Sequence, residues 1–295
     1  MLSFNKLTID DIAIIRPYFQ FTLSRACDNT IGGVFMWRDY FKTEYCFFKN
    51  TLIFKVIYVN GLVAFPIPLG PSAEDCLKEI ESYCKNQSIP FILCTSTEED
   101  IALYRKVYPS LHLTLNEDWS DYVYAKDDLV TLAGRKYSGQ RNHINYFQKN
   151  YTNYDFEEIT SQNLPEIKHF YVTSTAAHDK NTRIFHEEKD KTLEVLDNFD
   201  KYCLIGGLIR VNNDIVAFAI GEKVKDTLFV HIERADYNYR GSHQMIVNLF
   251  AKYFASEEIS FINREEDVGD EGLRTAKNAY HPIMKIEKYT VEVNL

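Results

Sequence analysis

The chain has 295 residues, a formal net charge of −9, 20 tyrosines and 20 phenylalanines. This length predicts two domains of roughly 150 residues each. A hydrophobic content of 45% excludes a disordered chain, because it supplies enough apolar side chains for packed cores. The negative charge argues against a protein that coats nucleic acid or an anionic bilayer, so an anionic partner must be met by a local basic patch.

The six cysteines form no CxxC pair and no zinc-finger spacing. They indicate buried thiols in a reducing compartment, and we expect a cytoplasmic protein. The N-terminal segment carries Asp10 and Asp11 where a signal peptide needs an apolar stretch. The most apolar run, 52–69, contains Lys55, Asn60 and two prolines, so we expect no membrane span.

The first half predicts alternating strands and helices in chain order. The expected elements are a strand over 3–6, a helix starting near Thr8, two strands flanking Asn60-Gly61, a helix over 73–86, a strand over 90–95, a helix over 98–108 and a strand over 119–124. The dipeptide Asn60-Gly61 favours a type I′ turn, because both central residues of that turn need a positive φ.

The second half repeats this order. We expect a strand over 155–159, a helix over 164–174, strands over 202–210, 214–222 and 227–234, a helix over 242–255, a strand over 259–263, a short helix and a closing strand over 283–293. The hairpin over 59–65 is similar in sequence to the hairpin over 211–218, half a chain length further on. Any two hairpins can share such a pattern, but the matching element order favours a duplication.

The sequence therefore predicts an α+β (α/β) fold of two duplicated domains, 1–127 and 128–295. Each domain is expected to hold a mixed, largely antiparallel sheet flanked by helices, and residues 128–150 form a linking helix. Gly134 and Gly139 each cost about 1 kcal/mol in a helix interior, so we expect a break near Gly139. Residues 129–153 form a basic island that includes Lys136, Arg141 and Lys149 and contains no acidic residue.

The loop over 233–244 leads from a strand into a helix. Unpaired backbone N–H groups at a helix N-terminus favour an anion, and Arg240 reinforces that preference. Tyr239-Arg240-Gly241 resembles the start of the R/Q-x-x-G-x-G/A loop that holds the coenzyme A pyrophosphate in GNAT acyltransferases. His243 and Met245 stand where that loop has small residues, which disfavours acetyl-CoA. The alternative interpretation of these residues is a tight turn.

The segment over 261–282 places Asn263, Arg264 and Glu265 at the C-terminal end of a strand. This edge of an α/β sheet is where ligands usually bind. The acids that follow, from Asp267 onward, and the basic Lys277 suit the two ends of a helix dipole without any functional role. The helix dipole does not account for Asn263, Arg264 and Glu265.

Several separated blocks of the sequence carry a family resemblance. They are Arg141-Asn142-His143-Ile144-Asn145, Tyr239-Arg240-Gly241 with Gln244, residues 263–269, Gly272-Leu273-Arg274, Ala276-Lys277 and Tyr280-His281-Pro282. Together they resemble the phosphatidylglycerol lysyltransferase C-terminal domain family, in its stand-alone soluble branch, over nearly the whole chain. The resemblance implies a tandem GNAT-like fold related to the Fem-type aminoacyltransferases, whose donor is an aminoacyl-tRNA. The membrane-spanning half of the lipid-modifying enzymes is not found here, so the acceptor is left open.

We therefore expect an acyl- or aminoacyl-transferase with a cleft between its halves. Glu265 or Asp267 is expected to act as the general base. The residues expected to bind the donor or substrate are Arg141, Asn142, His143, Asn145, Glu233, Tyr239, Arg240, Gly241, Asn263, Arg264 and Lys277. The basic segment over 135–149 is expected to hold a tRNA acceptor end. Aminoacyl-tRNA and acyl-CoA are the two expected donors, and no metal is expected.

Two other functions fit the same residues. One is a non-catalytic protein that binds a ligand on a degenerate GNAT scaffold. The other is an acyl-CoA N-acyltransferase that uses the first half, although that half lacks an R-x-x-G-x-G loop after its hairpin. His231 and Glu233 share one strand face and could ligate a metal, but two satisfied polar side chains are the simpler interpretation. His178, His186 and residues 187–191 resemble a solvated loop.

Overall fold

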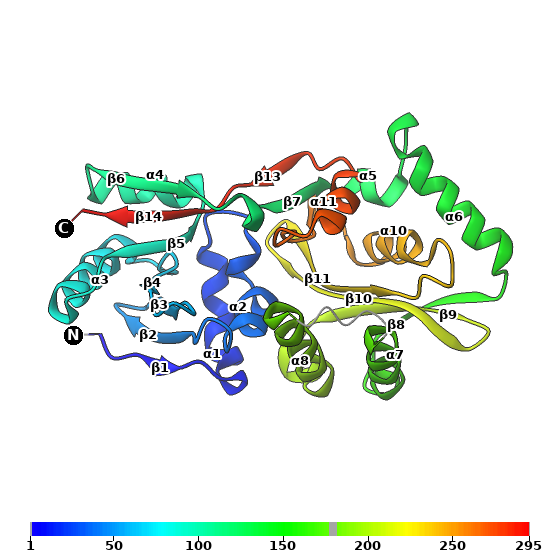
Figure 1. The fold of residues 1–295 in the computed structure, drawn as a ribbon, viewed down its shortest axis with the longest axis horizontal. Helices are drawn as coiled ribbons and strands as arrows, with labels where there is room; N and C mark the ends of the chain where they lie inside the picture. The colour runs from blue at the N-terminus through cyan, green and yellow to red at the C-terminus, as the bar shows by residue number, and fades with distance from the viewer. Residues whose placement is uncertain (1, 177–181, 295) are drawn as a thin grey trace. The chain divides into compact units, whose positions relative to one another are not determined.

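The computed structural model describes residues 2–176 and 182–294, and the chain divides into two compact units (Figure 1). Unit 1 comprises Met1–Asp121, Glu266–Gly269 and Lys285–Leu295. Unit 2 comprises Tyr122–Glu265 and Asp270–Met284. The sequence predicted two duplicated domains with the limits 1–127 and 128–295. These domain limits stay a prediction.

Unit 1 holds two small sheets. Its strands are β1 Asn5–Lys6, β2 Glu44–Phe48, β3 Thr51–Ile57, β4 Val63–Ala64, β5 Ile92–Ser96, β6 Leu111–Leu115 and β14 Tyr289–Val293. Strands β1-β2-β3-β4 form an antiparallel sheet in that order, and β14 lies antiparallel between β5 and β6. Phe65, which follows β4, pairs in parallel with Leu93 of β5 and so links the two sheets.

The helices of unit 1 cover these strands. They are α1 Ile12–Ile15, α2 Ile31–Trp37, α3 Ala73–Gln87 and α4 Glu98–Val107. Helix α3 packs against β3 and α4, with Leu77 and Ile80 fully buried. A capping box formed by Thr97 and Asp100 fixes the start of α4.

Unit 2 is built around a seven-stranded sheet in the order β13-β7-β12-β11-β10-β9-β8. Its strands are β7 Asp121–Ala125, β8 Tyr154–Glu158, β9 Ile205–Val211, β10 Asp214–Val224, β11 Thr227–Ala235, β12 Phe261–Asn263 and β13 Met284–Ile286. Strands β11 and β12 are parallel, whereas β12 pairs antiparallel with β7 and the β8-β9-β10-β11 meander is antiparallel.

Among the described residues of unit 2, seven helices accompany this sheet. They are α5 Lys126–Thr131, α6 Ser138–Asn150, α7 Leu164–Ala176, α8 Arg183–Asp197, α9 Phe199–Tyr202, α10 Ser242–Phe254 and α11 Glu271–Asn278. Helix α10 packs against β9, β10 and β11, and α7 packs against β10. Figure 1 shows α10 and α7 on opposite sides of the sheet. The buried face of α10 provides much of the core of unit 2.

The two units share one strand arrangement. An antiparallel meander is followed by one parallel step, between Phe65 and β5 in unit 1 and between β11 and β12 in unit 2. The strand beyond that step is antiparallel in both units, β14 in unit 1 and β7 in unit 2. The expected mixed, largely antiparallel sheets flanked by helices are therefore confirmed. The sequence did not indicate that the closing strand of each half belongs to the other sheet.

Both hairpins were predicted correctly, but the type I′ turn was assigned to the wrong one. In the first hairpin Gly61 has a φ of 84° whereas Asn60 does not have a positive φ. Tyr58 N donates to Leu62 O at 2.9 Å and closes a five-residue turn. Asn212 and Asn213 both have a positive φ, 51° and 76°. The two-residue loop in which both residues have the positive φ that a type I′ turn needs is therefore in the second hairpin.

Several local expectations were wrong. The break in the linking helix falls at Leu132 and Gly134, both with positive φ, and α6 runs through Gly139. The closing strand divides into β13 and β14. His178 lies outside the described residues, while 183–197 form helix α8 instead of a loop. Cys203 is exposed, although the other five cysteines are buried as expected. Among the described residues, no helix combines the length and the apolar character needed to cross a bilayer.

Candidate functional site

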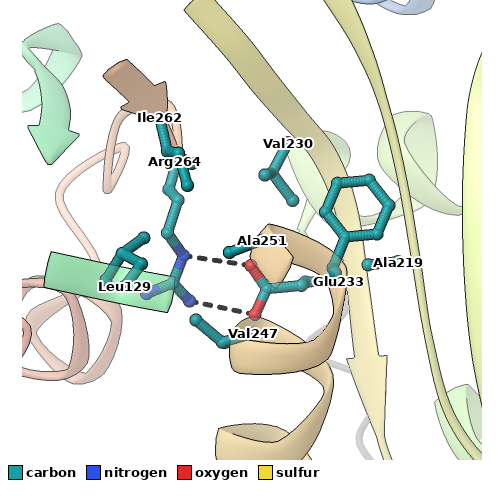
Figure 2. Close-up of a pocket in the computed structure, with 9 residues that line it drawn as sticks. Leu129, Ala219, Val230, Glu233, Val247, Ala251, Ile262 and Arg264 are labelled. Atoms are coloured by element: carbon teal, nitrogen blue, oxygen red, sulfur yellow. Dashed lines mark hydrogen bonds and ion pairs between the residues drawn. The ribbon is translucent and has the colours of Figure 1, made fainter. Parts of the chain in front are cut away.

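A buried ion pair joins two of the predicted donor-binding residues in unit 2. Arg264 follows β12 and lies next to Glu233 of β11 (Figure 2), with Nε 3.0 Å from Oε2 and Nη2 2.9 Å from Oε1. The His243 Nε2 atom lies 3.2 Å from the same Glu233 carboxylate. Burial alone would raise the pKa of Glu233, but Arg264 and His243 outweigh it and lower that pKa to about 2.

The space around this pair is closed. The cavity beside Arg264 has a volume of only about 10 Å³, and apolar side chains such as Val230, Val247 and Ile262 surround it (Figure 2). One water molecule would fill such a space. The buried Arg264 Nη1 atom has no hydrogen-bond acceptor among the residues that the structure describes. The pair is suited to hold β11 and β12 together, and a substrate does not fit beside it.

A second buried chain of polar groups includes the predicted base Glu265. His231 Nδ1 lies 2.6 Å from Glu265 Oε1, and His231 Nε2 lies 3.0 Å from Glu222 Oε1. Burial lowers the pKa of His231, but the two carboxylates outweigh it and raise that pKa to about 10. The imidazole is therefore protonated at neutral pH. Since both ring nitrogens have carboxylate partners, the interpretation of His231 as a satisfied polar side chain fits better than a metal ligand.

Residues around the end of β12 hold one another in place. Asn263 Oδ1 accepts a hydrogen bond from Glu265 N at 2.7 Å, and Glu265 has a φ of 58°. Lys277 Nζ donates to Arg264 O at 2.5 Å. Asp267 belongs to unit 1, where its buried Oδ1 accepts from Gly269 N at 2.9 Å. Asp267 therefore stabilises a turn, whereas the Glu265 side chain keeps 19% of its surface exposed.

The Tyr239-Arg240-Gly241 turn packs against helix α6. A Cβ atom at Gly241 would collide with the carbonyl oxygen of His143, and Gly241 has a φ of 94°, so only glycine fits without strain. The Tyr239 ring lies 5.2 Å from the ring of Tyr151. Arg240 is exposed, with its guanidinium 4.5 Å from the ring centre of Tyr146. Packing accounts for the glycine without a bound phosphate.

The remaining predicted residues lie on or beside α6. Arg141 donates to the carbonyl oxygens of Leu132 and Gly134 and so stabilises the break before the helix. Asn142 and Asn145 are exposed on α6. Arg141 therefore has a structural partner, whereas the two asparagines are accessible to a ligand.

Unit 1 contains a cavity of about 540 Å³ that the sequence did not indicate. This volume is within the range of small-molecule sites. Its wall includes the aromatic residues Trp37, Tyr40, Phe41, Tyr58 and Trp119, and its charged lining residues are Asp28, Glu266 and Lys288. The cavity thus combines an apolar wall with one charged end.

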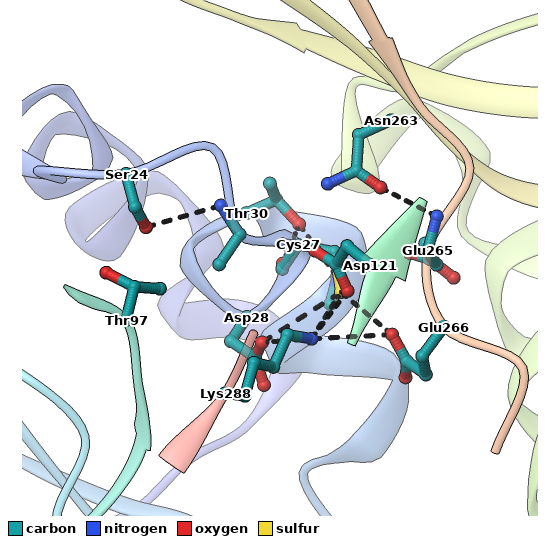
Figure 3. A network of polar contacts seen from close by, with 12 residues as sticks. Ser24, Cys27, Asp28, Thr30, Thr97, Asp121, Asn263, Glu265, Glu266 and Lys288 are labelled. Carbon is teal, nitrogen blue, oxygen red and sulfur yellow. Dashed lines mark hydrogen bonds and ion pairs between the residues drawn. The ribbon is translucent and has the colours of Figure 1, made fainter. Parts of the chain in front are cut away.

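The charged end belongs to a group that we call the Lys288 cluster, formed by Cys27, Asp28, Asp121, Glu266 and Lys288 (Figure 3). The Lys288 side chain is 1% exposed. Its Nζ atom lies 2.6 Å from Asp28 Oδ2, 2.7 Å from Asp121 Oδ1 and 3.5 Å from Glu266 Oε2. Cys27 Sγ lies 3.3 Å from the same Nζ atom. One ammonium group thus faces three carboxylates and a thiol.

The pKa shifts follow from this arrangement. Burial would lower the pKa of Lys288, but Asp121 and Asp28 hold it well above its usual value. Burial, and then Asp121 and Glu266, raise the pKa of the Cys27 thiol well above its usual value. Burial also raises the pKa of Asp28 although Lys288 opposes that shift. Cys27 is therefore a neutral thiol, which makes it a poor nucleophile.

Three members of the cluster have the spacing of a metal site. Cys27, Asp121 and Glu266 each offer one ligand atom, and these atoms lie within 4.8 Å of one another. The Lys288 ammonium already lies within 3.5 Å of a ligand atom of each of the three. A metal ion would have to displace it. The lysine therefore takes the place of a cation among these ligands.

A family model described as "Phosphatidylglycerol lysyltransferase, C-terminal" matches residues 19–292. The chain belongs to this family. The resemblance inferred from the separated sequence blocks is thus confirmed. The matched segment contains all the residues that line the cavity of unit 1 and those that form the ion pairs of unit 2.

Solved structures show the same fold. A conserved protein of unknown function from Bacteroides thetaiotaomicron superposes with a TM-score of 0.91 at 29% identity, over 100% of both chains. The L-PGS structure from Bacillus licheniformis has a TM-score of 0.68 at 14% identity, over 95% of this chain and 91% of that one. FemX has a TM-score of 0.60 at 8% identity, over 99% and 98%. The fold expected for this family and its Fem-type relatives is confirmed.

One curated relative matches part of the chain. An uncharacterized protein of Mycoplasmoides gallisepticum is 24% identical over 186 residues, which are 61% of this chain. The match spans 58% of the length of that relative.

The sequence did not indicate the cavity or the Lys288 cluster. The cluster draws its residues from four separate stretches of chain, at 27–28, 121, 266 and 288. Lys288 lies between β13 and β14, within a segment that reads as one continuous strand. Glu266 lies in the block 263–269 that carries the family resemblance, but its neighbours Glu265 and Asp267 were predicted as the general base. The local pattern contains no signal that brings these residues together.

Proposed function

We propose that this protein is an aminoacyltransferase that takes its aminoacyl group from aminoacyl-tRNA and transfers it to an amine or hydroxyl acceptor. Family membership and fold support the broader class, an aminoacyl- or acyl-transferase of the GNAT-like type. The observation that carries the proposal is the family match over 19–292. We also propose a cytoplasmic location, because the six cysteines are unpaired.

The start of helix α10 favours this donor over coenzyme A. Two positions where a coenzyme A loop has small residues carry His243, whose ring contacts Glu233, and Met245, which is buried in the core. Gly241 packs against the backbone of α6. These contacts leave less room for a pyrophosphate at the helix N-terminus. For the tRNA acceptor end we propose the 135–149 segment, where Arg135 and Lys149 are exposed.

In the proposed reaction the acceptor nitrogen or oxygen attacks the carbonyl carbon of the aminoacyl ester. A new amide or ester bond forms, the bond to the ribose oxygen breaks, and the ribose hydroxyl takes up a proton. The general base removes the proton of the acceptor. Of the two candidates we propose Glu265, because its carboxylate is partly exposed and is held by the charged His231. Asp267 is buried and bonded within a turn.

The test is a transfer assay with radiolabelled aminoacyl-tRNAs and, in parallel, labelled acyl-CoAs, each with pooled amines, hydroxyl compounds and lipids. Label should leave the tRNA in an enzyme-dependent way. Glu265→Gln should lower the rate by about 100-fold or more, which is the usual contribution of a general base. Glu257→Gln, at an exposed position of unit 2, is the matched control and should keep the parent rate. Transfer from acyl-CoA alone would refute the proposed donor.

The second candidate is a non-catalytic ligand-binding protein. It is favoured by the pairing of Glu233 with Arg264 and of Glu265 with His231, since paired side chains need no substrate to explain them. If neither aminoacyl-tRNA nor acyl-CoA donates its group, and the preparation still binds a ligand, the result would support this second function.

A further inference from the structure

The cavity of unit 1 is charged at one end only. Asp28, Glu266 and Lys288 line that end, and the other lining residues are uncharged. The volume of about 540 Å³ exceeds what a few water molecules or a bare ion require and is in the range of organic ligands. A ligand that fills this cavity therefore has an apolar body and a polar group at one end.

The charged end has an excess of negative charge. Lys288 is the one cation of the Lys288 cluster, and it faces the carboxylates of Asp28, Asp121 and Glu266. Cys27 adds no positive charge. The balance stays negative even when one of the three carboxylates is protonated. The charged side chains that line the cavity are two carboxylates and one ammonium group, so this end attracts a cationic ligand more strongly than an anionic one.

Lys288 itself is poorly placed to bind an anion. Its ammonium lies 2.6 Å from Asp28 and 2.7 Å from Asp121, and these contacts occupy two of its three N–H donors. An anionic ligand would also approach Glu266, which lies 3.5 Å from the same ammonium. Like-charge repulsion therefore disfavours carboxylate or phosphate ligands here.

The aromatic wall favours a cation as well. Phe41 lies at its centre, with ring centres of Tyr40, Tyr58 and Trp119 at 4.9, 5.5 and 6.0 Å, all in edge-to-face arrangements. Trp37 continues the wall, 5.8 Å from Tyr40. Such rings bury a hydrocarbon body, and their faces attract a positive charge.

We propose that the unit 1 cavity binds an organic ammonium ion, with its hydrocarbon part against the wall between Trp37 and Trp119 and its ammonium group at Asp28 and Glu266. A metal ion does not fit this description, because Lys288 lies among the ligand atoms that it would use. Binding at this site is independent of the transfer reaction proposed above, so either proposal can fail without the other.

Tryptophan fluorescence reports on this cavity directly. The chain has two tryptophans, and both Trp37 and Trp119 line the cavity. The full chain is titrated with 2-phenylethylammonium, with excitation at the red edge of tryptophan absorption. The matched probes are 3-phenylpropanoate, which carries the opposite charge, and neutral 2-phenylethanol. We expect a saturable change in emission with the ammonium probe and at least tenfold weaker binding of the other two.

Three variants assign the binding to this end of the cavity. Asp28→Asn and Glu266→Gln should each weaken binding of 2-phenylethylammonium at least tenfold, whereas Glu74→Gln, at an exposed position of α3, should not. Leu62→Arg places a cation in the cavity wall and leaves the Lys288 cluster unchanged, so it should abolish binding even if the first two variants are unstable. Equal affinity for the three probes, or parent affinity in Leu62→Arg, would overturn the proposal.

Discussion

Each unit has a charged centre beside a cavity, and these two centres are built differently. In unit 2, Arg264 and Glu233 match one cation with one anion through two parallel hydrogen bonds, and the space beside them holds no more than a water molecule. In unit 1, Lys288 faces three carboxylates at the end of a ligand-sized cavity. A balanced pair in a closed space is suited to hold strands together. An unbalanced cluster beside open space is suited to receive a ligand.

This difference also changes which residues deserve functional tests. The sequence directed attention to Arg264 at a strand end and to Glu233 at the start of the loop before α10, and in the structure the two side chains pair with each other in unit 2. The cluster with the stronger case for binding lies in unit 1 and contains none of the residues predicted to be catalytic. Removing a charge should therefore affect stability at both centres, but it should affect ligand binding only at the centre of unit 1.

The largest expected effect on stability comes from removing the one cation of the unbalanced centre. Lys288→Met removes the ammonium group from the carboxylates of Asp28, Asp121 and Glu266 and should lower the free energy of unfolding by about 3–5 kcal/mol. Urea denaturation followed by circular dichroism measures this change. Lys78→Met, on the exposed face of α3, is the control and should stay within about 0.5 kcal/mol of the parent. A similarly small change in Lys288→Met would show that the cluster is not a buried charged centre.

The Arg264–Glu233 pair of unit 2 should make the free energy of unfolding depend on pH in the acidic range. Because the pKa of Glu233 is lowered to about 2, its contribution is fully present above its unfolded pKa, about 4.3, and is lost as the pH falls through 2. The contribution amounts to about 3 kcal/mol at neutral pH. Glu233→Gln should therefore be less stable than the parent by about this amount at pH 6, and the difference should shrink towards pH 2.

Urea denaturation at a series of pH values checks this second expectation. Glu257→Gln provides the control, because its carboxylate is exposed in the same unit. If the difference in the free energy of unfolding between the parent and Glu233→Gln stays constant with pH, Arg264 does not lower the pKa of Glu233. The contrast between the two centres would then be wrong.

The smallest expected effects test whether the turn before α10 is shaped by packing. Gly241→Ala should be destabilised, because the added Cβ meets the carbonyl oxygen of His143 at a positive φ. Gly139→Ala, in the first turn of α6 with no atom near its Cβ position, should instead be stabilised by about 0.5–1 kcal/mol. Thermal unfolding of the two variants without ligand measures both changes. A neutral Gly241→Ala would favour an anion-binding loop over a packed turn.

Local sequence patterns predicted most of the secondary structure. The dipeptide Asn60-Gly61 marked the first hairpin, and the strands expected over 202–210 and 214–222 marked the second. Helix α10 was expected over 242–255 and is observed as Ser242–Phe254. Helix α8 was missed because the charged run from His186 to Lys191 reads as solvated, although Phe185, Val195 and Leu196 bury one of its faces.

The candidate site was less predictable for a physical reason. Asn263, Arg264 and Glu265 could be singled out because they follow one strand and act locally. The Lys288 cluster depends on contacts between residues far apart in the sequence, such as Cys27 with Lys288. Residue types and spacing carry no signal for such contacts, so neither the cluster nor the cavity could be predicted from one sequence.

The exchange of closing strands has a consequence for how the chain is made. Strand β14 pairs with β5 and β6 in unit 1, although it follows all the strands of unit 2 in the chain. The first half of a growing chain therefore leaves the ribosome with the edges of β5 and β6 unpaired and without Lys288 to offset Asp28 and Asp121. Both the sheet and the charged centre of unit 1 are completed only when Lys288 and strand β14 have been synthesised, whereas the partner strand β7 precedes the rest of unit 2 in the chain. Unit 1, most of which is synthesised before unit 2, therefore completes its folding after strand β14 has been added.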